Sequence, residues 1–429
     1  MKKLLIAALA LAMLPILIVG ASAKEEPIVS CALTVLASRT DMAKTALVGE
    51  DISFSKEDFC RAMNVSGIDS LTIVSVPELT EGRLTVGGLI LAEGQSLSGE
   101  NLNMLKFVPA SKEVKQSGFD FSTGNGYSVR CNLYFVDEMN YSPTVSLASD
   151  NSLAVNTHDM VSRVGKLDAY DPDGDKFVYE IVSYPENGSV VLLDREEGRY
   201  VYTPKENFTG NDSFSYVARD IYGNYSAAAS VSVDVKARRS SVTFGDIDDC
   251  NIYNAALTMA ENSMMTGTEI DGVTYFEPKQ NITRAEFLAL AMKAAGISDP
   301  GSVDKTVFAD DEDIPGEYKG YVSAAYQLGY ISGTDMDGVL CFMPNSSVTR
   351  AEAAVMLNSI LTLDREVEKP VILPVFADSS ELPFWASDAI YSMNSMGVLS
   401  MIDGYASPEA TVTRGDAAQM LEAVINLYE

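Results

Sequence analysis

Hydrophobic and polar residues follow two different periods along this chain of 429 residues. In the first half, apolar residues alternate with a period of two in short runs, as over 231–235, and Gly, Asn and Pro turns separate the runs. Such runs are typical of half-buried strands in antiparallel sandwiches. In the second half, small apolar residues recur at helical spacing, for example at Ala255, Ala256 and Met259. The pattern predicts a multidomain chain in which all-β sandwiches precede an all-α region.

The first 23 residues have the features of a secretory signal peptide. Lys2 and Lys3 form the charged start, an apolar run follows over 4–19, and small residues over 21–23 suit cleavage. This run is shorter than the ~20 residues that a membrane span needs, and no later stretch is long enough. We therefore expect residues 1–23 to be removed and the mature chain to be secreted without a membrane span.

Two markers recur in phase through the second half of the chain. The tetrapeptide Thr-Arg-x-Glu/Asp begins at Thr283, Thr349 and Thr413, at intervals of 66 and 64 residues. A tripeptide Phe-x-Asp lies upstream of each copy. Its aspartates are Asp246, Asp310 and Asp378. Because a fixed period indicates repeated structural units, we expect three units of helix, loop and helix. Their ranges are 244–304, 305–370 and 371–429.

Most of the tetrapeptide has a local explanation. A Thr followed three residues later by an acidic side chain forms a capping box, which closes the N-terminus of a helix. Capping does not require arginine at the first helical position, yet Arg284, Arg350 and Arg414 all stand there. We therefore expect the arginines to serve recognition, and we expect Arg350→Ala to leave folding nearly unchanged.

The three units resemble the S-layer-homology (SLH) family. The resemblance implies a pseudo-threefold assembly whose grooves bind an anionic, commonly pyruvylated, secondary cell-wall polymer. It implies polymer contacts from Arg284, Arg350, Arg414, Glu286, Glu352, Asp416, Asp246, Asp310, Asp378 and Trp385. Only the third unit keeps the tryptophan, but it replaces Ala-Glu by Gly415-Asp416, and the first unit has Ser263 where the others have glycine. We expect the second groove to be the most complete and the first the least.

The first half contains two related segments, over 24–140 and 141–236, and a linker over 237–243 joins them to the repeats. The second segment carries three motifs at sandwich spacing. They are Asp171-Pro-Asp-Gly-Asp175, Tyr200-x-Tyr-x-Pro204 and Phe208-x-Gly-x-Asp-x-Phe214. This segment resembles bacterial cadherin-like and Ig-like β-sandwich modules. The first segment lacks the acidic run, so its assignment as a divergent copy rests on spacing.

Three aspartates of the acidic run stand at alternate positions around a glycine. Asp171, Asp173 and Asp175 would present hard carboxylate oxygens of the kind that calcium prefers, and Asp220 could approach from a neighbouring loop. The alternative is a solvated acidic turn in which aspartate bonds its own backbone. The sequence leaves both open, and no cofactor other than calcium is expected.

Charge, histidine and cysteine content narrow the classes of function. The net charge is -29, so nucleic acid is a poor partner, because its phosphates would meet a negative surface. His158 is the only histidine, and neither H-E-x-x-H nor G-x-S-x-G occurs. We expect His158 in an exposed loop, no catalytic residues and no enzyme activity. The cysteines indicate neither a disulfide framework nor a zinc site, although one bridge among Cys31, Cys60 and Cys131 stays open.

These inferences predict a secreted bacterial surface-layer or wall-associated protein. SLH repeats would hold it non-covalently on the wall polymer, β modules would be displayed, and copies could self-associate in a surface layer. One alternative is an adhesin in which residues 24–236 bind a host or cell-surface ligand. Another is a wall-anchored carbohydrate-active enzyme, because the abundant Asp and Glu leave a catalytic carboxylate pair open.

Overall fold

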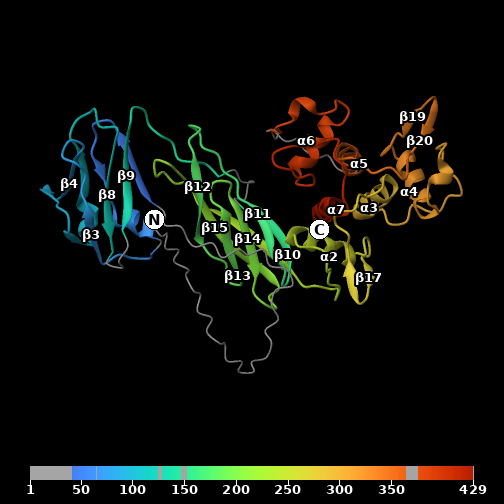
Figure 1. Cartoon of the computed structure of the whole chain (residues 1–429), viewed down its shortest axis with the longest axis horizontal. Coiled ribbons are helices and arrows are strands. Elements are labelled where there is room, and N and C mark those ends of the chain that lie inside the picture. Colours follow the sequence, from blue (N-terminus) through green and yellow to red (C-terminus); the bar gives the residue numbers. More distant parts are fainter. Residues whose placement is uncertain (1–40, 64, 124–127, 146–151, 364–374, 429) are drawn as a thin grey trace, which may run out of the picture.

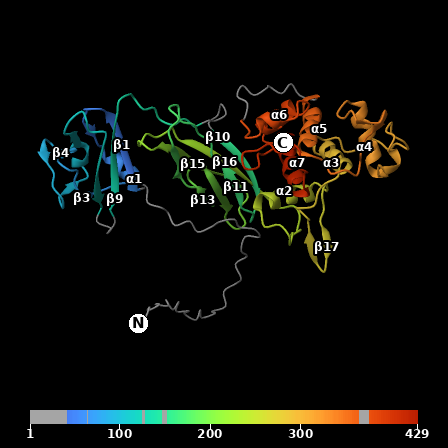
Figure 2. The ribbon, with the colours of Figure 1, turned by 45° about the horizontal axis from the view of Figure 1, so that its top comes forward.

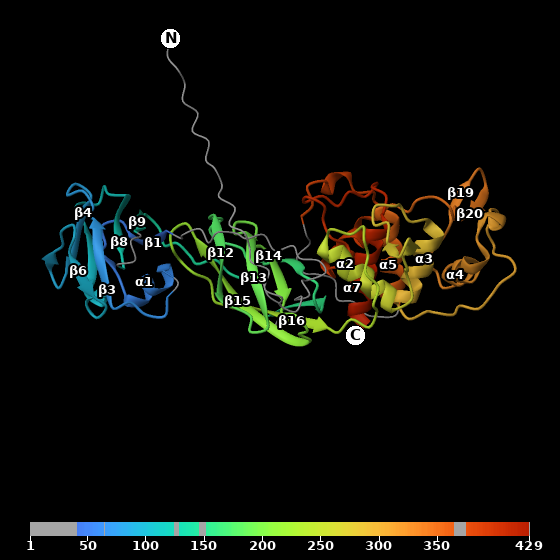
Figure 3. The ribbon, with the colours of Figure 1, turned by 60° about the horizontal axis from the view of Figure 1, so that its bottom comes forward.

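The structure is a computed structural model that describes residues 41–63, 65–123, 128–145, 152–363 and 375–428. The predicted signal peptide and Cys31 lie outside these described residues. Two β modules and a helical region follow one another along the long axis of the molecule (Figure 1). The second β module lies between the other two parts in every view (Figures 2 and 3).

The first β module is a sandwich whose two sheets have the strand orders β1-β9-β8-β3-β6 and β2-β7-β4-β5. Phe107, Phe119 and Phe121 are fully buried between them. Strand β9 alternates between buried and less buried residues, as the pleat of a half-buried strand requires. Its elements are β1 (Met42–Leu47), β2 (Ile52–Ser53), α1 (Lys56–Met63), β3 (Ser70–Ser75), β4 (Gly82–Val86), β5 (Leu89–Ile90), β6 (Ser96–Ser98), η1 (Asn101–Met104), β7 (Leu105–Pro109), β8 (Gln116–Ser122) and β9 (Val129–Val136).

The second β module is a sandwich with the strand orders β10-β16-β15-β12 and β11-β14-β13. Val231, Val233 and Val235 of β16 all face its core, which confirms the alternation seen in the sequence. Its strands are β10 (Ser152–His158), β11 (Arg163–Lys166), β12 (Phe177–Ser183), β13 (Gly188–Asp194), β14 (Arg199–Pro204), β15 (Gly210–Asp220) and β16 (Ala229–Lys236).

Neither sandwich is purely antiparallel, which corrects the prediction from the sequence. Strand β1 pairs with β9 in parallel, and β10 pairs with β16 in parallel. In both modules the first strand lies beside the last strand and runs in the same direction. Strand direction depends on how distant segments pair, so a local pattern of alternation does not contain it.

The helical region has three helix pairs around one core. The first helices are α2 (Cys250–Glu261), α4 (Gly316–Gln327) and α6 (Ser387–Ser395). The second helices are α3 (Arg284–Ala294), α5 (Arg350–Leu363) and α7 (Arg414–Tyr428). Each second helix begins at the arginine of the tetrapeptide, as the repeats predicted. No helix among the described residues is both long and apolar enough to cross a lipid bilayer.

The first two units are not simple helix, loop and helix. Hairpins separate their helices, namely β17 (Thr268–Ile270) with β18 (Val273–Tyr275), and β19 (Thr334–Met336) with β20 (Val339–Cys341). Asp271 and Gly272 form the first turn with φ values of 52° and 80°, and Asp337 and Gly338 form the second with 54° and 84°. Asp-Gly with both residues at positive φ is the turn that best closes a two-residue hairpin. The Asp-Gly pairs are therefore the sequence signal for both hairpins.

The linker segment and the only histidine are both packed at the joint between the second β module and α2. The backbone N–H of Arg238 donates to Asp159, and the backbone N–H of Arg239 donates to Glu261. His158 is 3% exposed, which contradicts the expectation of an exposed loop. It is the last residue of β10, and the helical region covers it there.

The described cysteines do not form the disulfide that the sequence left open. Cys60 and Cys131, the two described cysteines of that set, are both free thiols. Cys131 is fully buried in the first β module, and this burial raises the pKa of its thiol far above the ordinary value. It therefore behaves as a small apolar core residue.

Candidate functional site

The Thr of each tetrapeptide caps its own helix, and in the second and third units the acidic residue completes the predicted capping box. Thr349 Oγ1 accepts from the Glu352 N–H at 3.2 Å, and Glu352 Oε2 accepts from the Thr349 N–H at 2.9 Å. Asp416 closes the same box with Thr413 at 3.0 Å although its side chain is one carbon shorter. These reciprocal bonds satisfy donors that a helix N-terminus would otherwise leave unpaired.

Each of these helices also begins against a loop of another unit. The N–H of Arg284 donates to Ser346 O at 2.8 Å, from the first unit to the second. The N–H of Arg350 donates to Ala410 O at 2.9 Å, from the second unit to the third. The N–H of Arg414 donates to Gln280 O at 2.7 Å, from the third unit back to the first. The three contacts close a ring, and we call each contact region a seam.

Arg350 fills the seam between the second and third units. Its Nε donates to Ala406 O at 2.8 Å and its Nη2 donates to Ser400 O at 2.5 Å. The residue is 3% exposed, and burial lowers the pKa of the guanidinium against the opposing effect of Asp416 and Asp378. This geometry is at odds with the expectation that Arg350→Ala would leave folding nearly unchanged, because the carbonyls of the buried Ala406 and of Ser400 would lose a charged donor.

Arg414 occupies the corresponding seam between the third and first units. Its Nε donates to Phe276 O at 3.0 Å, and its Nη1 forms an ion pair with Glu286 Oε1 at 3.2 Å. The guanidinium lies 5.1 Å from the centroid of the Phe276 ring. The Glu286 side chain therefore binds the arginine of another unit.

Arg284 has the fewest partners of the three arginines. Its Nη1 forms an ion pair with Glu352 Oε1 at 3.0 Å, and its guanidinium lies 5.4 Å from the Phe342 ring centroid. Its Nε is buried and has no hydrogen-bond partner. Burial lowers the pKa of this guanidinium, and Glu352 opposes that effect. The first seam thus keeps a cation with one unmet donor beside an aromatic ring.

The aspartates of the Phe-x-Asp marker bind backbone donors within their own units. Asp310 Oδ1 accepts from the Phe342 N–H at 2.9 Å, and its Oδ2 accepts from the Met343 N–H at 2.7 Å. Asp246 and Asp378 make the same pair of bonds in the first and third units. Burial alone would raise the pKa of Asp378, but these backbone donors hold it below its ordinary value. The marker therefore fixes the loop that enters the tetrapeptide.

Trp385 lies immediately before α6 and is 59% exposed. The adjacent Phe384 is 97% exposed, and reasoning from the sequence overlooked it. The sequence signal for Phe384 is that Phe384 and Trp385 form an apolar pair that fits neither the helical core pattern nor a capping motif. Both exposed rings belong to the third unit.

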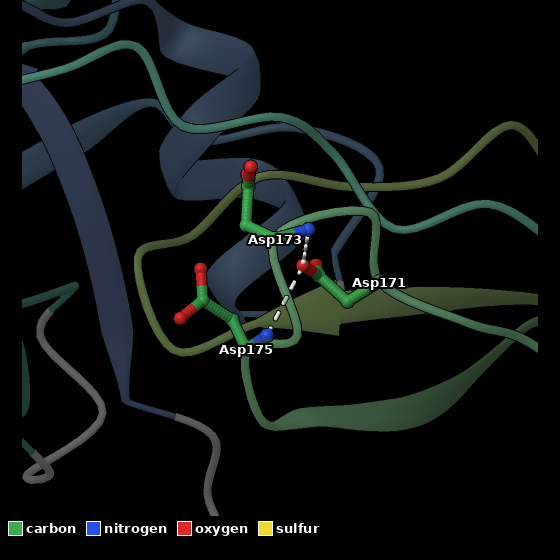
Figure 4. A group of neighbouring side chains, drawn as sticks. All are labelled: Asp171, Asp173 and Asp175. Carbon is green, nitrogen blue, oxygen red and sulfur yellow. Dashed lines mark hydrogen bonds between the residues drawn. The ribbon is translucent and has the colours of Figure 1, made fainter.

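The acidic run of the second β module brings three carboxylates together (Figure 4). One carboxylate oxygen from each of Asp171, Asp173 and Asp175 lies within 4.8 Å of the others. Asp171 Oδ1 accepts from the N–H groups of Asp173 at 2.9 Å and Asp175 at 3.2 Å, whereas its Oδ2 is buried without a partner. The two bonds to Oδ1 fit an acidic turn in which aspartate binds its own backbone. The unpartnered Oδ2, with the carboxylates of Asp173 and Asp175 nearby, fits a cation such as calcium.

Asp220 is not part of this group of three. Its carboxylate is buried and accepts from the Asn224 N–H at 2.8 Å and from Asn224 Nδ2 at 2.9 Å. Burial raises the pKa of Asp220, and the bonds from Asn224 oppose that shift. Asn140, which the sequence analysis did not select, instead donates from Nδ2 to Asp175 Oδ2 at 2.6 Å.

Family models match two parts of the chain. Residues 140–237 match the bacterial cadherin-like domain, and residues 307–354 match the S-layer homology domain. These matches confirm both resemblances that the sequence motifs indicated. The S-layer homology match lies in the second of the three units.

Curated proteins from bacteria align with parts of this chain. An amylopullulanase of Thermoanaerobacterium thermosulfurigenes is 25% identical over 187 residues, which are 43% of this chain and 9% of that protein. The surface-layer 125 kDa protein of Lysinibacillus sphaericus is 29% identical over 118 residues, 27% of this chain and 10% of that protein. The cellulosome-anchoring protein of Acetivibrio thermocellus is 25% identical over 192 residues, 43% of this chain and 38% of that protein.

The chain thus spans well under half the length of these relatives. Among solved structures, the fibronectin(III)-like modules of Clostridium thermocellum CbhA cover 46% of this chain and 92% of their own, at 16% identity and a TM-score of 0.21.

Proposed function

Because this chain carries a bacterial cadherin-like domain and an S-layer homology domain, we propose that it is a secreted surface protein whose three C-terminal units hold it on the cell wall. The ligand in this proposal is an anionic, pyruvylated secondary cell-wall polymer, and the two β modules are displayed beyond it. The likeness to a surface-layer protein and a cellulosome-anchoring protein supports the wall-anchored location. The ring of seams supports a pseudo-threefold SLH assembly.

The unmet donor of Arg284 is the observation that carries this proposal. A buried donor without an acceptor costs about 1–3 kcal/mol, and a carboxylate entering the seam would remove that cost. Guanidinium suits a carboxylate because its planar fork can form two parallel bonds. The backbone N–H of Arg284 is already bound to Ser346 O, so the side chain, and not the helix terminus, is the group that recognises the ligand. Trp385 and Phe384 supply an apolar surface for sugar rings elsewhere in the region.

Binding to purified cell wall tests the proposal directly. The full chain should sediment with wall that carries its polymer and should stay in solution with wall from which the polymer has been stripped. A chain truncated after Lys236 should not sediment with either. Equal binding of the full chain to stripped and intact wall would contradict polymer recognition.

An adhesive role for the β modules is the alternative with structural support. Leu89 and Ile90 form β5, an exposed edge strand of the first β module that pairs with β4. Strand β4 lies at the end of the molecule away from the helices (Figure 1). An exposed apolar edge of this kind suits a protein partner. The relatives include an amylopullulanase, but only 9% of that protein aligns with this chain.

Calcium binding by Asp171, Asp173 and Asp175 is a second part of the proposal. The buried, unpartnered Asp171 Oδ2 supports it, because an ion would give this oxygen a ligand bond. Added calcium should then raise the melting temperature of the second β module in the full chain, since a ligand of the folded state stabilises that state. Asp173→Asn should remove the shift.

Asp194→Asn is the matched control for charge and turn type. Asp194 also bonds its own turn, through the N–H groups of Glu196 and Glu197, but it belongs to no group of three carboxylates. A calcium shift of the same size in the parent and in both variants would contradict the assigned ligands. The absence of any shift in the parent would favour the self-bonded acidic turn.

A further inference from the structure

The first helices of the three units can be compared position by position, because each ends in the same turn. The turn residues, all at positive φ, are Ser263, Gly329 and Gly397. The residues four positions earlier, all fully buried, are Met259, Ala325 and Met393. In each unit this buried residue accepts a backbone hydrogen bond from the residue that follows the turn. The three helices are therefore structurally equivalent up to this point.

Twelve positions before the turn, the three units differ in what covers the chain. The residues at this position are Asn251, Glu317 and Trp385. Glu317 is exposed and Trp385 is 59% exposed, whereas Asn251 binds the second β module. Asn251 Oδ1 accepts from the Val164 N–H at 2.9 Å, and its Nδ2 donates to Val164 O at 2.9 Å. Because β11 is the edge strand of its sheet, the asparagine side chain pairs there as a neighbouring strand would.

The same β module covers the next turn of α2. Asn254 is fully buried, donates from Nδ2 to Ser162 O at 3.0 Å and accepts at Oδ1 from the His158 backbone N–H at 2.9 Å. Val161, between β10 and β11, is fully buried in the core of the helical region. A polymer could take this surface only by replacing these hydrogen bonds and by exposing Val161 to water. The module is therefore docked on α2 and not merely tethered to it.

An ion pair extends this contact to the third unit. Arg163 Nη1 of β11 lies 3.0 Å from Glu422 Oε2, and the Glu422 side chain is 7% exposed. Glu422 belongs to α7, which packs against α2. The second β module thus binds both units that form the third seam.

The equivalent surfaces of the other two units carry no β module. Asp388, three positions after Trp385, is exposed, although its equivalent in α2 is the buried Asn254. In the second unit the equivalent residue is Gly320, where a Cβ atom would lie 2.1 Å from Gly301 O. The loop that precedes α4 therefore covers this position but leaves Glu317 exposed. In the part of the chain that the structure describes, α2 alone uses this surface to bind a β strand.

We propose that the second β module occupies, on the first unit, the surface that the second and third units leave free for the wall polymer. This inference rests on the proposed function, in which the exposed rings beside α6 contact sugar. The chain then offers the polymer at most two of its three equivalent surfaces, those of α4 and α6. It uses the remaining surface, on α2, to hold its own β module beside the wall-binding units.

Hydrogen exchange of the Val164 amide tests the docking without any wall. Because this N–H is bound to Asn251, it should exchange at least about tenfold more slowly in the parent than in Asn251→Ala. Glu317→Ala changes the equivalent position of α4 and should leave the Val164 rate unchanged. Equal Val164 rates in the parent and in Asn251→Ala would overturn the docking.

The same amide shows whether the polymer displaces the module. On purified wall that carries its polymer, Val164 should exchange as slowly as in the free chain. Acrylamide should quench the fluorescence of Trp385, the only tryptophan, less on wall than in solution. Faster exchange of Val164 on wall would overturn the proposal, because the polymer would then have taken the surface of α2. Unchanged quenching of Trp385 would overturn the assignment of the α6 surface to the polymer.

Two substitutions at equivalent positions compare the surfaces in one assay. Trp385→Ala should weaken sedimentation with polymer-bearing wall roughly threefold to tenfold, because an exposed ring that contacts sugar is lost. Asn251→Ala should leave wall affinity within about twofold of the parent, since the polymer does not use its surface. A similar loss in both variants would overturn the proposal. If the parent does not bind wall at all, the proposed function fails, and the polymer assignment fails with it, while the docking measured at Val164 in the free chain stands.

Discussion

Two seams contain the same tetrapeptide, Thr-Arg-Ala-Glu, but its arginine makes different hydrogen bonds in each. Arg350 lies in the seam between the second and third units, and Arg284 lies in the seam between the first and second units. Arg350 donates hydrogen bonds from Nε and Nη2 to the backbone carbonyls of Ala406 and Ser400. The residue beside its guanidinium is the small Ala406. Arg284 has one ion pair and an unpaired Nε, and its neighbour is the ring of Phe342. In the same sequence motif, the arginine Nε is hydrogen-bonded at one seam and has no acceptor at the other. The second arginine therefore has its Nε bound to a carbonyl, whereas the Nε of the first is the donor that a ligand could still bind.

Arg350→Ala should have the largest effect on stability. The substitution leaves two carbonyls without a charged donor and empties a buried volume, so we expect a loss of about 3 kcal/mol in the free energy of unfolding of the helical region. Urea unfolding followed by helical circular dichroism measures this loss. A change within about 0.5 kcal/mol would restore the interpretation of Arg350 as a surface recognition residue.

Arg284→Ala should separate binding from stability. Its guanidinium has one ion pair and one unmet donor, so we expect a stability loss of only about 1 kcal/mol. Affinity for polymer-bearing wall should fall by an amount of ~1–3 kcal/mol, and Arg284→Lys should recover part of it, because an ammonium keeps the charge without the planar fork. Quantitative sedimentation with wall measures the affinity.

Lys305→Ala is the control for this experiment, because Lys305 is an exposed cation of the same region that lies outside the seams. It should bind wall as the parent does. If Arg350→Ala instead lost wall binding at unchanged stability while Arg284→Ala kept it, the roles assigned to the two seams would be wrong.

Acid should loosen the second unit before the others, because among the described residues its partly buried ion pair of Lys319 and Asp311 has no counterpart in the other two units. Lys319 Nζ donates to Asp311 Oδ2 at 2.7 Å, and this bond, with that from the Thr306 N–H, lowers the pKa of Asp311 to about 2. A carboxyl whose pKa is depressed by folding stabilises the fold above its unfolded value and loses that contribution as the pH falls. The protection factors of the α4 amides, which are corrected for the intrinsic pH dependence of exchange, should therefore fall between about pH 4 and pH 2.

Lys319→Met provides the comparison for this pH effect. It removes the hydrogen bond that contributes most to the shift, so the exchange of α4 should depend less on pH over the same range. An unchanged pH dependence in this variant would show that Asp311 is not the group that acid titrates.

Ser263→Gly should have the smallest effect, and it should be stabilising. Ser263 ends α2 with a φ of 56°, in the conformation that Gly329 and Gly397 adopt in the other units. Glycine adopts this conformation without steric cost, so we expect a gain of about 0.5–1 kcal/mol in the first unit. Melting temperature measures the gain, and Gly329→Ser should lose a similar amount in the second unit.

The sequence was most informative where cause and effect lie within a few residues. The capping boxes join residues three apart, the alternation of β16 depends on neighbouring positions, and Asp171, Asp173 and Asp175 meet because a single turn connects them. Both family resemblances rest on such local motifs. The repeats also predicted where the second helix of each unit begins.

Only the tertiary structure decided which partners these local motifs acquire. Arg414 and Glu286 are 128 residues apart, and His158 and Asn254 are 96 apart. The sequence could not decide which of the three arginines would be saturated with hydrogen bonds, or whether His158 would be exposed or buried. A side chain's hydrogen-bond partner depends on which distant backbone packs beside it. The same reason explains the missed burial of Arg350. A local pattern fixes the direction of a side chain from its own helix, whereas the docking of another unit decides whether that side chain meets carbonyls, a carboxylate or solvent.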